Sequence, residues 1–146
     1  MFNCPTARGN IATMNREKNS HPKLVAFINS DVNKRNNESP EFMMLQSGYA
    51  NGYVAIPPSH PDYGKNLMDD ESIEVHGGVT FCESYATCKK RFKNMEFIGE
   101  ASGVKGHWWV IGFDTCHFLD SLERCPREYV IKEVNHLKSQ LEQRWN

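Results

Sequence analysis

The run "HWWVIGFD", residues 107–114, constrains the fold more than any other part of the chain. On a strand, alternate side chains point to opposite faces. One face would carry His107, Trp109, Ile111 and Phe113, and the other Trp108, Val110, Gly112 and Asp114. Because both sets are largely apolar, this strand should be central in a sheet that is covered on both sides.

The pattern at the end of the chain predicts a helix that would cover one face of this sheet. Pro126 suits a first helical turn. The apolar residues that follow repeat at steps of four and three, as one face of a helix requires: Val130, Val134, Leu137, Leu141 and Trp145. We therefore expect an α+β fold, a small and mainly antiparallel sheet with a C-terminal helix packed on it.

Four further segments read as strands joined by turns. "NMEFIGEA" precedes "SGVKG" and "HWWVIGFD", a pattern typical of a hairpin, and "FMMLQ" and "YVAI" flank a second turn, "SGYANG". "SIEVHGGVTF" reads as a strand interrupted by Gly77 and Gly78. "PPSHPDYGKN" has three prolines and a glycine, so it should be an ordered loop beside the sheet.

The beginning of the chain is poorly patterned. Residues 1–40 are rich in Asn and charged residues, and only "KLVAFI" resembles a strand or short helix. We expect residues 1–40 to be weakly ordered or peripheral and residues 41–146 to form a single α+β domain.

Charge and cysteine content exclude several classes of protein. The net charge is -1 over 146 residues, whereas a nucleic-acid-binding domain needs a surplus of cations. No leader is evident, and no apolar run approaches the roughly 20 residues of a membrane span, so a cytosolic protein is expected. The five cysteines form no CxxC pair, which disfavours a disulfide framework or a structural zinc site.

Histidines and carboxylates carry the candidate chemistry. His76, Asp114 and His117 offer the nitrogen and oxygen ligands of a catalytic metal site, with His60 as a further ligand or, like Glu74, a general base. The spacing matches no established metal motif. The residues alone favour a structural interpretation over a metal site. In that interpretation, these side chains make hydrogen bonds that fix the conformation of their own loops. A Cys116–His117 dyad is disfavoured because neighbours in sequence usually point apart.

Aromatic residues and glycines suggest a binding pocket instead. Trp108 and Trp109 offer flat faces on which a planar ring could stack. The backbone at Gly77 and Gly78 permits close approach by a ligand or a neighbouring segment, and its N–H groups could bind an anion.

The motifs taken together resemble a family of small proteins encoded in tailed-phage and prophage genomes. Its pattern matches residues 52–64 ("GYVAIPPSHPDYG"), 76–80 ("HGGVT") and 109–117 ("WVIGFDTCH"), followed by a closing helix. The family usually has Cys directly after the Asp, whereas Thr115 stands here. The resemblance implies an accessory protein that acts in the host cytoplasm. By analogy with other small phage proteins, it also implies a role against host defence, through sequestration of a nucleotide-derived signal.

The leading hypothesis is therefore a homo-oligomeric protein that captures a nucleotide-like small molecule, without catalytic residues, cofactor or metal, and that binds neither nucleic acid nor membrane. The proposed ligand-binding residues are His60, Tyr63, His76, Gly77, Gly78, Trp108, Trp109, Asp114 and His117. One alternative is a metal-dependent hydrolase of a nucleotide or phosphate ester, with His76, Asp114 and His117 as ligands. Another is a protein that inhibits a host factor by binding it.

Overall fold

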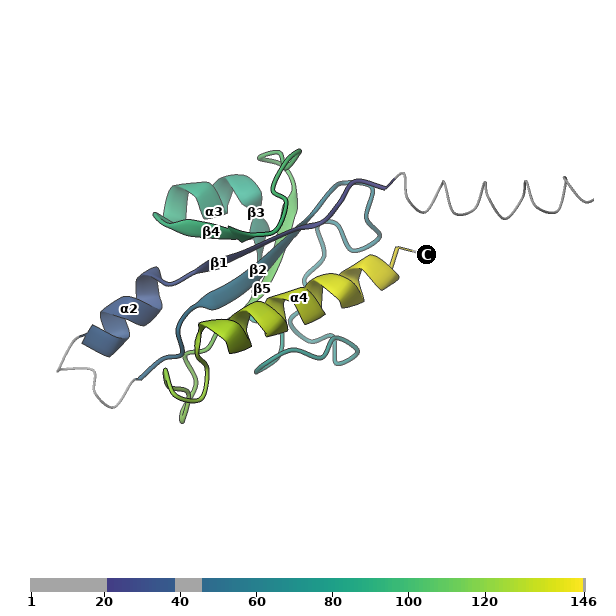
Figure 1. Cartoon of the computed structure of the whole chain (residues 1–146). Coiled ribbons are helices and arrows are strands. Elements are labelled where there is room, and N and C mark those ends of the chain that lie inside the picture. Colours follow the sequence, from purple (N-terminus) through teal and green to yellow (C-terminus); the bar gives the residue numbers. More distant parts are fainter. Residues whose placement is uncertain (1–20, 39–45, 146) are drawn as a thin grey trace, which may run out of the picture.

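The sheet is antiparallel throughout and lies between two helices, as the computed structural model of the chain shows (Figure 1). The structure describes residues 21–38 and 46–145. The strands are β1 (Val25–Asn29), β2 (Asn51–Ile56), β3 (Phe81–Ser84), β4 (Met95–Ile98) and β5 (Trp109–Phe113), and the helices are α2 (Asp31–Glu38), α3 (Tyr85–Arg91) and α4 (Arg127–Gln143). The strands pair in the order β3-β5-β2-β1-β4. The predicted α+β class with a C-terminal helix is confirmed.

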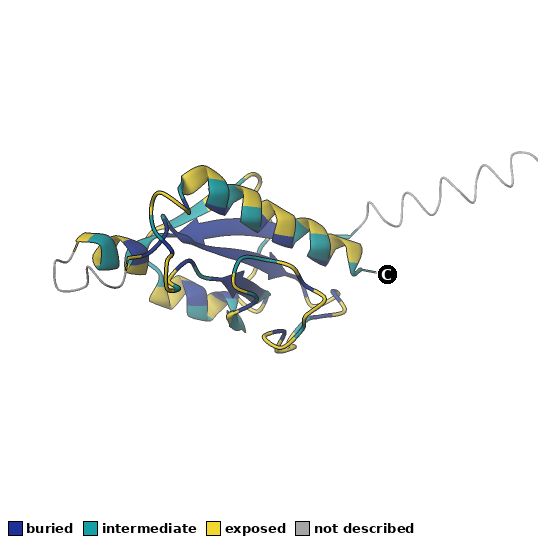
Figure 2. Cartoon of the chain, turned by 90° about the horizontal axis from the view of Figure 1, so that it is seen from below, coloured by how far each residue is buried: buried dark blue, intermediate teal, exposed yellow. Residues whose placement is uncertain are grey.

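Each face of the sheet has its own apolar core. α4 packs on β1 and β2, with Val130, Val134, Leu137 and Leu141 fully buried, and α3 lies on the opposite face. Figure 2 shows the buried strands between the two helices, whose outer surfaces are exposed. No helix in the described ranges combines the length and apolar character needed to cross a membrane.

β5 has the predicted central position. It pairs with β2 on one side and β3 on the other. Ile111 and Phe113 belong to the core under α4, whereas Trp108, just before the strand, and Val110 belong to the core under α3. The two-sided apolar pattern therefore reflects two covered faces.

The expectation that residues 1–40 are peripheral is wrong for β1, although most residues of α2 are partly or fully exposed. β1 is fully buried and pairs with both β2 and β4. Phe27 stacks on Tyr53, with ring centroids 5.1 Å apart. The burial of "KLVAFI" was underestimated because polar segments flank it and because its partner strands are distant in sequence. Residues 1–20 and 39–45, which include most of "FMMLQ", lie outside the described residues.

The predicted hairpin between residues 94–101 and 107–114 does not form. Both strands exist, but β4 pairs with β1 and β5 pairs with β2 and β3. Buried on both faces, β5 occupies an interior position, while β4 closes the edge beside β1. The glycine-bearing segment between them therefore connects two separated strands.

The segment 72–81 is mostly not a strand. Turns and irregular backbone run from Ser72 to Thr80, and β3 begins only at Phe81. The two glycines have φ angles of +69° at Gly77 and +81° at Gly78, which a strand cannot accommodate. His76 is therefore presented by a loop.

Candidate metal centre

Two loops meet beside the first turns of α4. One contains the turn from Val75 to Gly78, closed by the Gly78 N–H donating to the Val75 carbonyl over 2.8 Å. The other follows β5. A Cβ atom on Gly77 would lie 2.6 Å from Nε2 of His117, far inside van der Waals contact. The expected close approach at the glycines is thus confirmed at Gly77, and the neighbour is an imidazole ring.

Two histidines and one aspartate converge where these loops meet, and we call His76, His117 and Asp120 the His–Asp cluster. Nε2 of His76 lies 3.0 Å and 3.1 Å from the two carboxylate oxygens of Asp120. Nδ1 of His117 lies 2.9 Å from Oδ2 of the same carboxylate. Asp120 therefore bridges two imidazoles that come from segments about 40 residues apart.

Residues of α4 hold His76 in place. Its Nδ1 lies 2.7 Å from the hydroxyl of Tyr129, and its backbone N–H donates to Oε1 of Glu133 over 2.9 Å. These two residues stand four apart on α4, so they share one face of the helix. If an ion occupied the cluster, a proton on Nδ1 donated to Tyr129 would leave the Nε2 lone pair for the ion, as in the outer-shell support of metal-binding histidines.

The second loop is tightly wound around Asp120. The Asp120 N–H donates to the His117 carbonyl over 2.9 Å, and the His117 N–H donates to Oδ2 of Asp120 over 2.9 Å. Leu119 between them has a φ of +79°, in the left-handed region, where a residue other than glycine costs about 1–3 kcal/mol. This strain is retained in the loop that places His117 and Asp120.

The electrostatics favour an ionised Asp120. Burial raises the pKa of this carboxyl, but hydrogen bonds from the His117 backbone and from the side chains of His76 and His117 outweigh burial, so the pKa lies below its usual value. The nearby thiol of Cys125 is 3.8 Å from Oδ1 of Asp120, and burial raises its pKa to about 11. Cys125 therefore remains a protonated neighbour and not a thiolate ligand at neutral pH.

The spacing of the cluster suits a divalent metal ion. One ligand atom from each residue lies within 4.8 Å of the others. An ion bound at ~2.0–2.2 Å in a tetrahedral site holds its ligand atoms roughly 3.3–3.6 Å apart, so it would replace the shorter contacts of His76 and His117 with Asp120. The side chain of His117 is 38% exposed and that of His76 is 19% exposed, so an ion could enter from solvent.

Asp114 was expected to bind with the two histidines, but Asp120 takes that position. Oδ1 of Asp114 lies 3.6 Å from Nε2 of His117, on the opposite side of the ring from the nitrogen that faces Asp120. The same oxygen accepts the N–H of Cys116 over 2.9 Å. Asp114 therefore orders the turn after β5 and flanks the cluster.

The prediction that His60 shares a site with His76 is wrong. His60 is buried, its Nδ1 accepts the Asp62 N–H, and its Nε2–H is left to donate to the Leu141 carbonyl over 2.7 Å. Leu141 lies twelve residues beyond Tyr129, or about 18 Å along α4. Burial lowers the pKa of His60, consistent with a neutral ring that caps the end of the helix.

Three of the other predicted ligand-binding residues, Tyr63, Trp108 and Trp109, also lie apart from the cluster. Trp108 is buried in the core under α3. The indole N–H of Trp109 donates to the Lys65 carbonyl over 2.8 Å, and the hydroxyl of Tyr63 donates to the His107 carbonyl. These contacts attach the proline-rich loop to the beginning of β5. A Cβ on Gly78 would meet no atom within 4 Å, so only its backbone conformation requires glycine.

Three residues of the site were missed in the sequence. Asp120 follows His117 by three positions, and this His-x-x-Asp spacing can place both side chains on one tight turn. Tyr129 and Glu133 share a polar helix face beside the apolar stripe of α4. The approach of this face to His76 depends on tertiary packing, which no local pattern reveals.

Replacement of Gly77 tests the packing of the two loops. Gly77→Ala should destabilise the fold by about 1–2 kcal/mol for the positive φ alone, and by roughly 1 kcal/mol more because the methyl group collides with His117. The measurement is urea unfolding. Gly78→Ala is the matched control, since it has the same backbone cost without the collision. Equal losses in the two variants would contradict the close contact.

Comparisons with models of known protein families, with curated proteins and with solved structures give no significant match. The resemblance to phage-encoded proteins therefore stays a prediction, and the function is inferred from the geometry.

Proposed function

We propose that the protein is a metal-dependent hydrolase of a phosphate ester, with His76, His117 and Asp120 as the metal ligands. The observation that carries this proposal is the convergence of two imidazoles and an ionised carboxylate from two separate loops at a partly exposed position. Among the hypotheses drawn from the sequence, it is the hydrolase that these contacts support best.

The number and kind of ligands favour catalysis over a structural role. Three nitrogen and oxygen ligands leave coordination positions for water and substrate, whereas structural zinc sites are closed by four protein ligands. Such an ion would supply the Lewis acidity that activates a water molecule as a nucleophile near neutral pH. Asp114, whose carboxylate lies 3.6 Å from the other ring nitrogen of His117, would orient this imidazole from outside the ligand set.

The surroundings support a substrate with an apolar part. Phe118, Leu119 and Leu122 belong to the same loop as Asp120 and are 88%, 60% and 51% exposed. Such large apolar side chains are normally covered, and next to a catalytic centre they would contact the organic group of an ester. The metal ion would neutralise the oxygens of the phosphate.

Hydrolysis of p-nitrophenyl phosphate and of its bis-ester tests the proposal. Purified protein with added Zn²⁺ or Mn²⁺ should release p-nitrophenol, and either EDTA or His76→Ala should lower the rate by about 100-fold or more, since a metal ion contributes several kcal/mol. His136→Ala is the matched control, because this exposed histidine on α4 lies outside the cluster. Metal binding without metal-dependent turnover of either ester would refute the hydrolase.

Capture of a nucleotide-derived signal, action in a phage-infected host, a homo-oligomeric state and inhibition of a host protein stay predictions. Capture through one pocket that unites His60, His76 and Trp108 is not supported, because these residues lie in different parts of the fold.

A further inference from the structure

A second polar region lies at the same end of the sheet, where β1 leads into α2 and α3 leads into β4. It surrounds a cavity of about 540 Å³, which we call the basic cavity, lined by Asn29, Asp31, Val32, Lys34, Arg35, Arg91, Phe92 and Lys93. This volume is within the range of small-molecule sites, roughly 300–1,000 Å³. None of the lining residues belongs to the His–Asp cluster.

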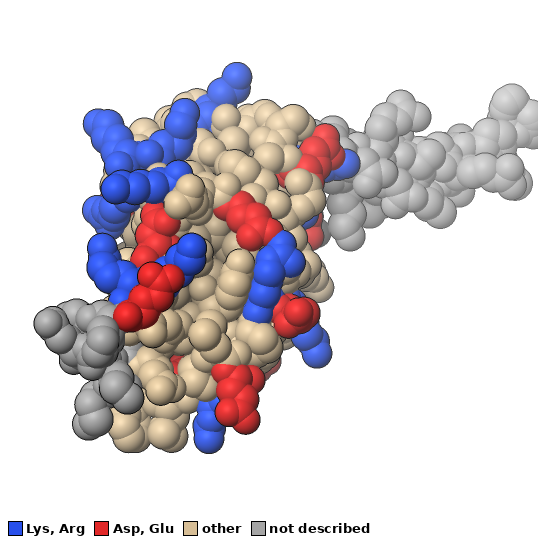
Figure 3. Space-filling view, turned by 60° about the vertical axis from the view of Figure 1, so that its left-hand side comes forward, with Lys and Arg blue, Asp and Glu red and all other residues tan. Residues whose placement is uncertain are grey.

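The rim of the basic cavity carries four cations from two separate segments. Lys34 and Arg35 come from α2, and Arg91 and Lys93 from the junction of α3 and β4. All four are exposed, and none takes part in an ion pair among the residues that the structure describes. Figure 3 shows Lys and Arg side chains gathered on the side of the molecule where α2 and α3 lie in Figure 1.

The one carboxylate in the lining is engaged by the protein itself. Oδ2 of Asp31 accepts the N–H of Lys93 over 2.9 Å, and Oδ1 accepts from the side chain of Asn94 over 3.4 Å. These contacts attach the beginning of α2 to the beginning of β4. Asp31 therefore builds the cavity wall, and the cations of the rim remain available to an anionic ligand.

The cavity also has an apolar part. Phe92 packs against Tyr53, with ring centroids 5.0 Å apart, and remains partly exposed. Val32 on α2 is 39% exposed. Asn33 fixes α2 in place, because its side chain donates to Asn51 over 3.0 Å and to Thr115 over 3.1 Å. The apolar surface is thus held beside the cationic rim by buried contacts.

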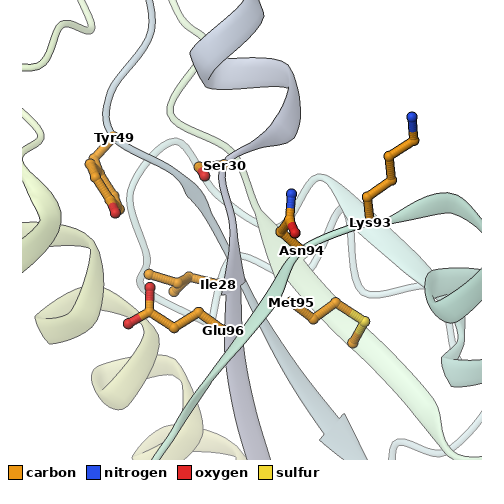
Figure 4. A pocket seen from close by; sticks show the side chains of 7 residues that line it. All are labelled: Ile28, Ser30, Tyr49, Lys93, Asn94, Met95 and Glu96. Atoms are coloured by element: carbon orange, nitrogen blue, oxygen red, sulfur yellow. The ribbon is translucent and has the colours of Figure 1, made fainter.

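A neighbouring hollow of about 310 Å³ lacks this combination. It is lined by Ile28, Ser30, Tyr49, Lys93, Asn94, Met95 and Glu96. In Figure 4, the side chain of Lys93 extends away from Tyr49 and Glu96. Glu96 pairs with Arg127, so this hollow offers no excess of positive charge.

We propose that the basic cavity binds a phosphorylated small molecule that carries a planar ring, the chemistry of a nucleotide. Arginine and lysine on the rim bind the phosphate groups, and Val32 and Phe92 contact the ring. Arginine is suited to this role because its guanidinium donates two parallel hydrogen bonds to phosphate oxygens. This site does not depend on the metal centre.

Calorimetric titration with ADP and with pyrophosphate tests the proposal, in about 50 mM salt with EDTA to exclude metal-mediated binding. Wild-type protein should bind one ADP per chain, and more tightly than pyrophosphate, which lacks the ring. Arg35→Glu/Arg91→Glu should weaken ADP binding by ~10-fold or more, because two charge-assisted contacts become repulsive. The control Lys105→Glu/Lys132→Glu makes the same change of charge at exposed positions outside the cavity and should retain the wild-type affinity.

Several outcomes would overturn the proposal: no saturable binding of ADP, equal losses in the two double variants, or pyrophosphate binding as tightly as ADP. A single-stranded oligonucleotide that binds more tightly than ADP and displaces it would show that the rim binds a nucleic-acid backbone instead. Thermal unfolding of both double variants checks that they fold. Asp120→Asn, which changes only the His–Asp cluster, should leave ADP binding unchanged. The proposed ADP site and the proposed hydrolase can therefore be refuted independently of each other.

Discussion

Asp120→Asn should weaken divalent-metal binding by about 100-fold or more, equivalent to ~3 kcal/mol. Asparagine has nearly the same shape and keeps an acceptor for the His117 N–H, but it removes the negative charge that lies between the two imidazoles. The affinity is measured by titration with Co²⁺, whose visible absorption changes when nitrogen and oxygen ligands bind it.

Asp114→Asn is the matched control for this change. Both carboxylates lie near His117, but only that of Asp120 also contacts His76. We expect Asp114→Asn to change the affinity by less than about 10-fold, the lower range for a residue outside the first coordination shell. A larger loss in Asp114→Asn than in Asp120→Asn would favour the ligand set expected from the sequence over the one assigned from the structure.

Phe27→Ala should destabilise the protein by about 3–5 kcal/mol, a large part of the 5–15 kcal/mol typical of a domain. Phe27 is fully buried, stacks on Tyr53, and contacts Tyr85 edge to face. The measurement is urea unfolding followed by circular dichroism. Should the alanine variant fail to fold, Phe27→Leu keeps most of the volume and should lose about 1–1.5 kcal/mol.

Phe97→Ala provides the comparison for this prediction. Phe97 lies opposite Phe27 on the adjacent strand β4 and is 36% exposed, so less apolar area is lost when it is truncated. We expect a loss of about 1 kcal/mol, in line with its smaller burial. If Phe27→Ala cost no more than Phe97→Ala, β1 would be peripheral, as its polar flanks in the sequence suggested.

The parts of the fold that could be predicted are those with a strong local pattern. β5 shows apolar residues on both faces, and α4 shows a regular stripe from Val130 to Leu141, so both were recognised. Strand pairing could not be predicted, because the choice between β1 and β5 as the partner of β4 depends on contacts far apart in sequence. β1 was recognised as a possible strand, but its buried position between β2 and β4 was missed for the same reason.

The candidate site was predicted only in part. His76 and His117 were correctly placed near each other, with glycine at the point of contact. His60 was misassigned because a histidine that caps a buried helix end looks like a ligand in the sequence. Asp120 was overlooked because the more prominent Asp114 directly follows β5, and the turn at Leu119 that directs Asp120 inward is visible only in three dimensions.

The Co²⁺ titration of the wild-type protein tests the metal centre most directly. The geometry predicts saturation at one equivalent per chain, with visible absorption bands that are absent in His76→Ala and retained in His136→Ala. No saturable change in the wild-type protein, or an unchanged titration in His76→Ala, would contradict the assignment of His76, His117 and Asp120 as metal ligands.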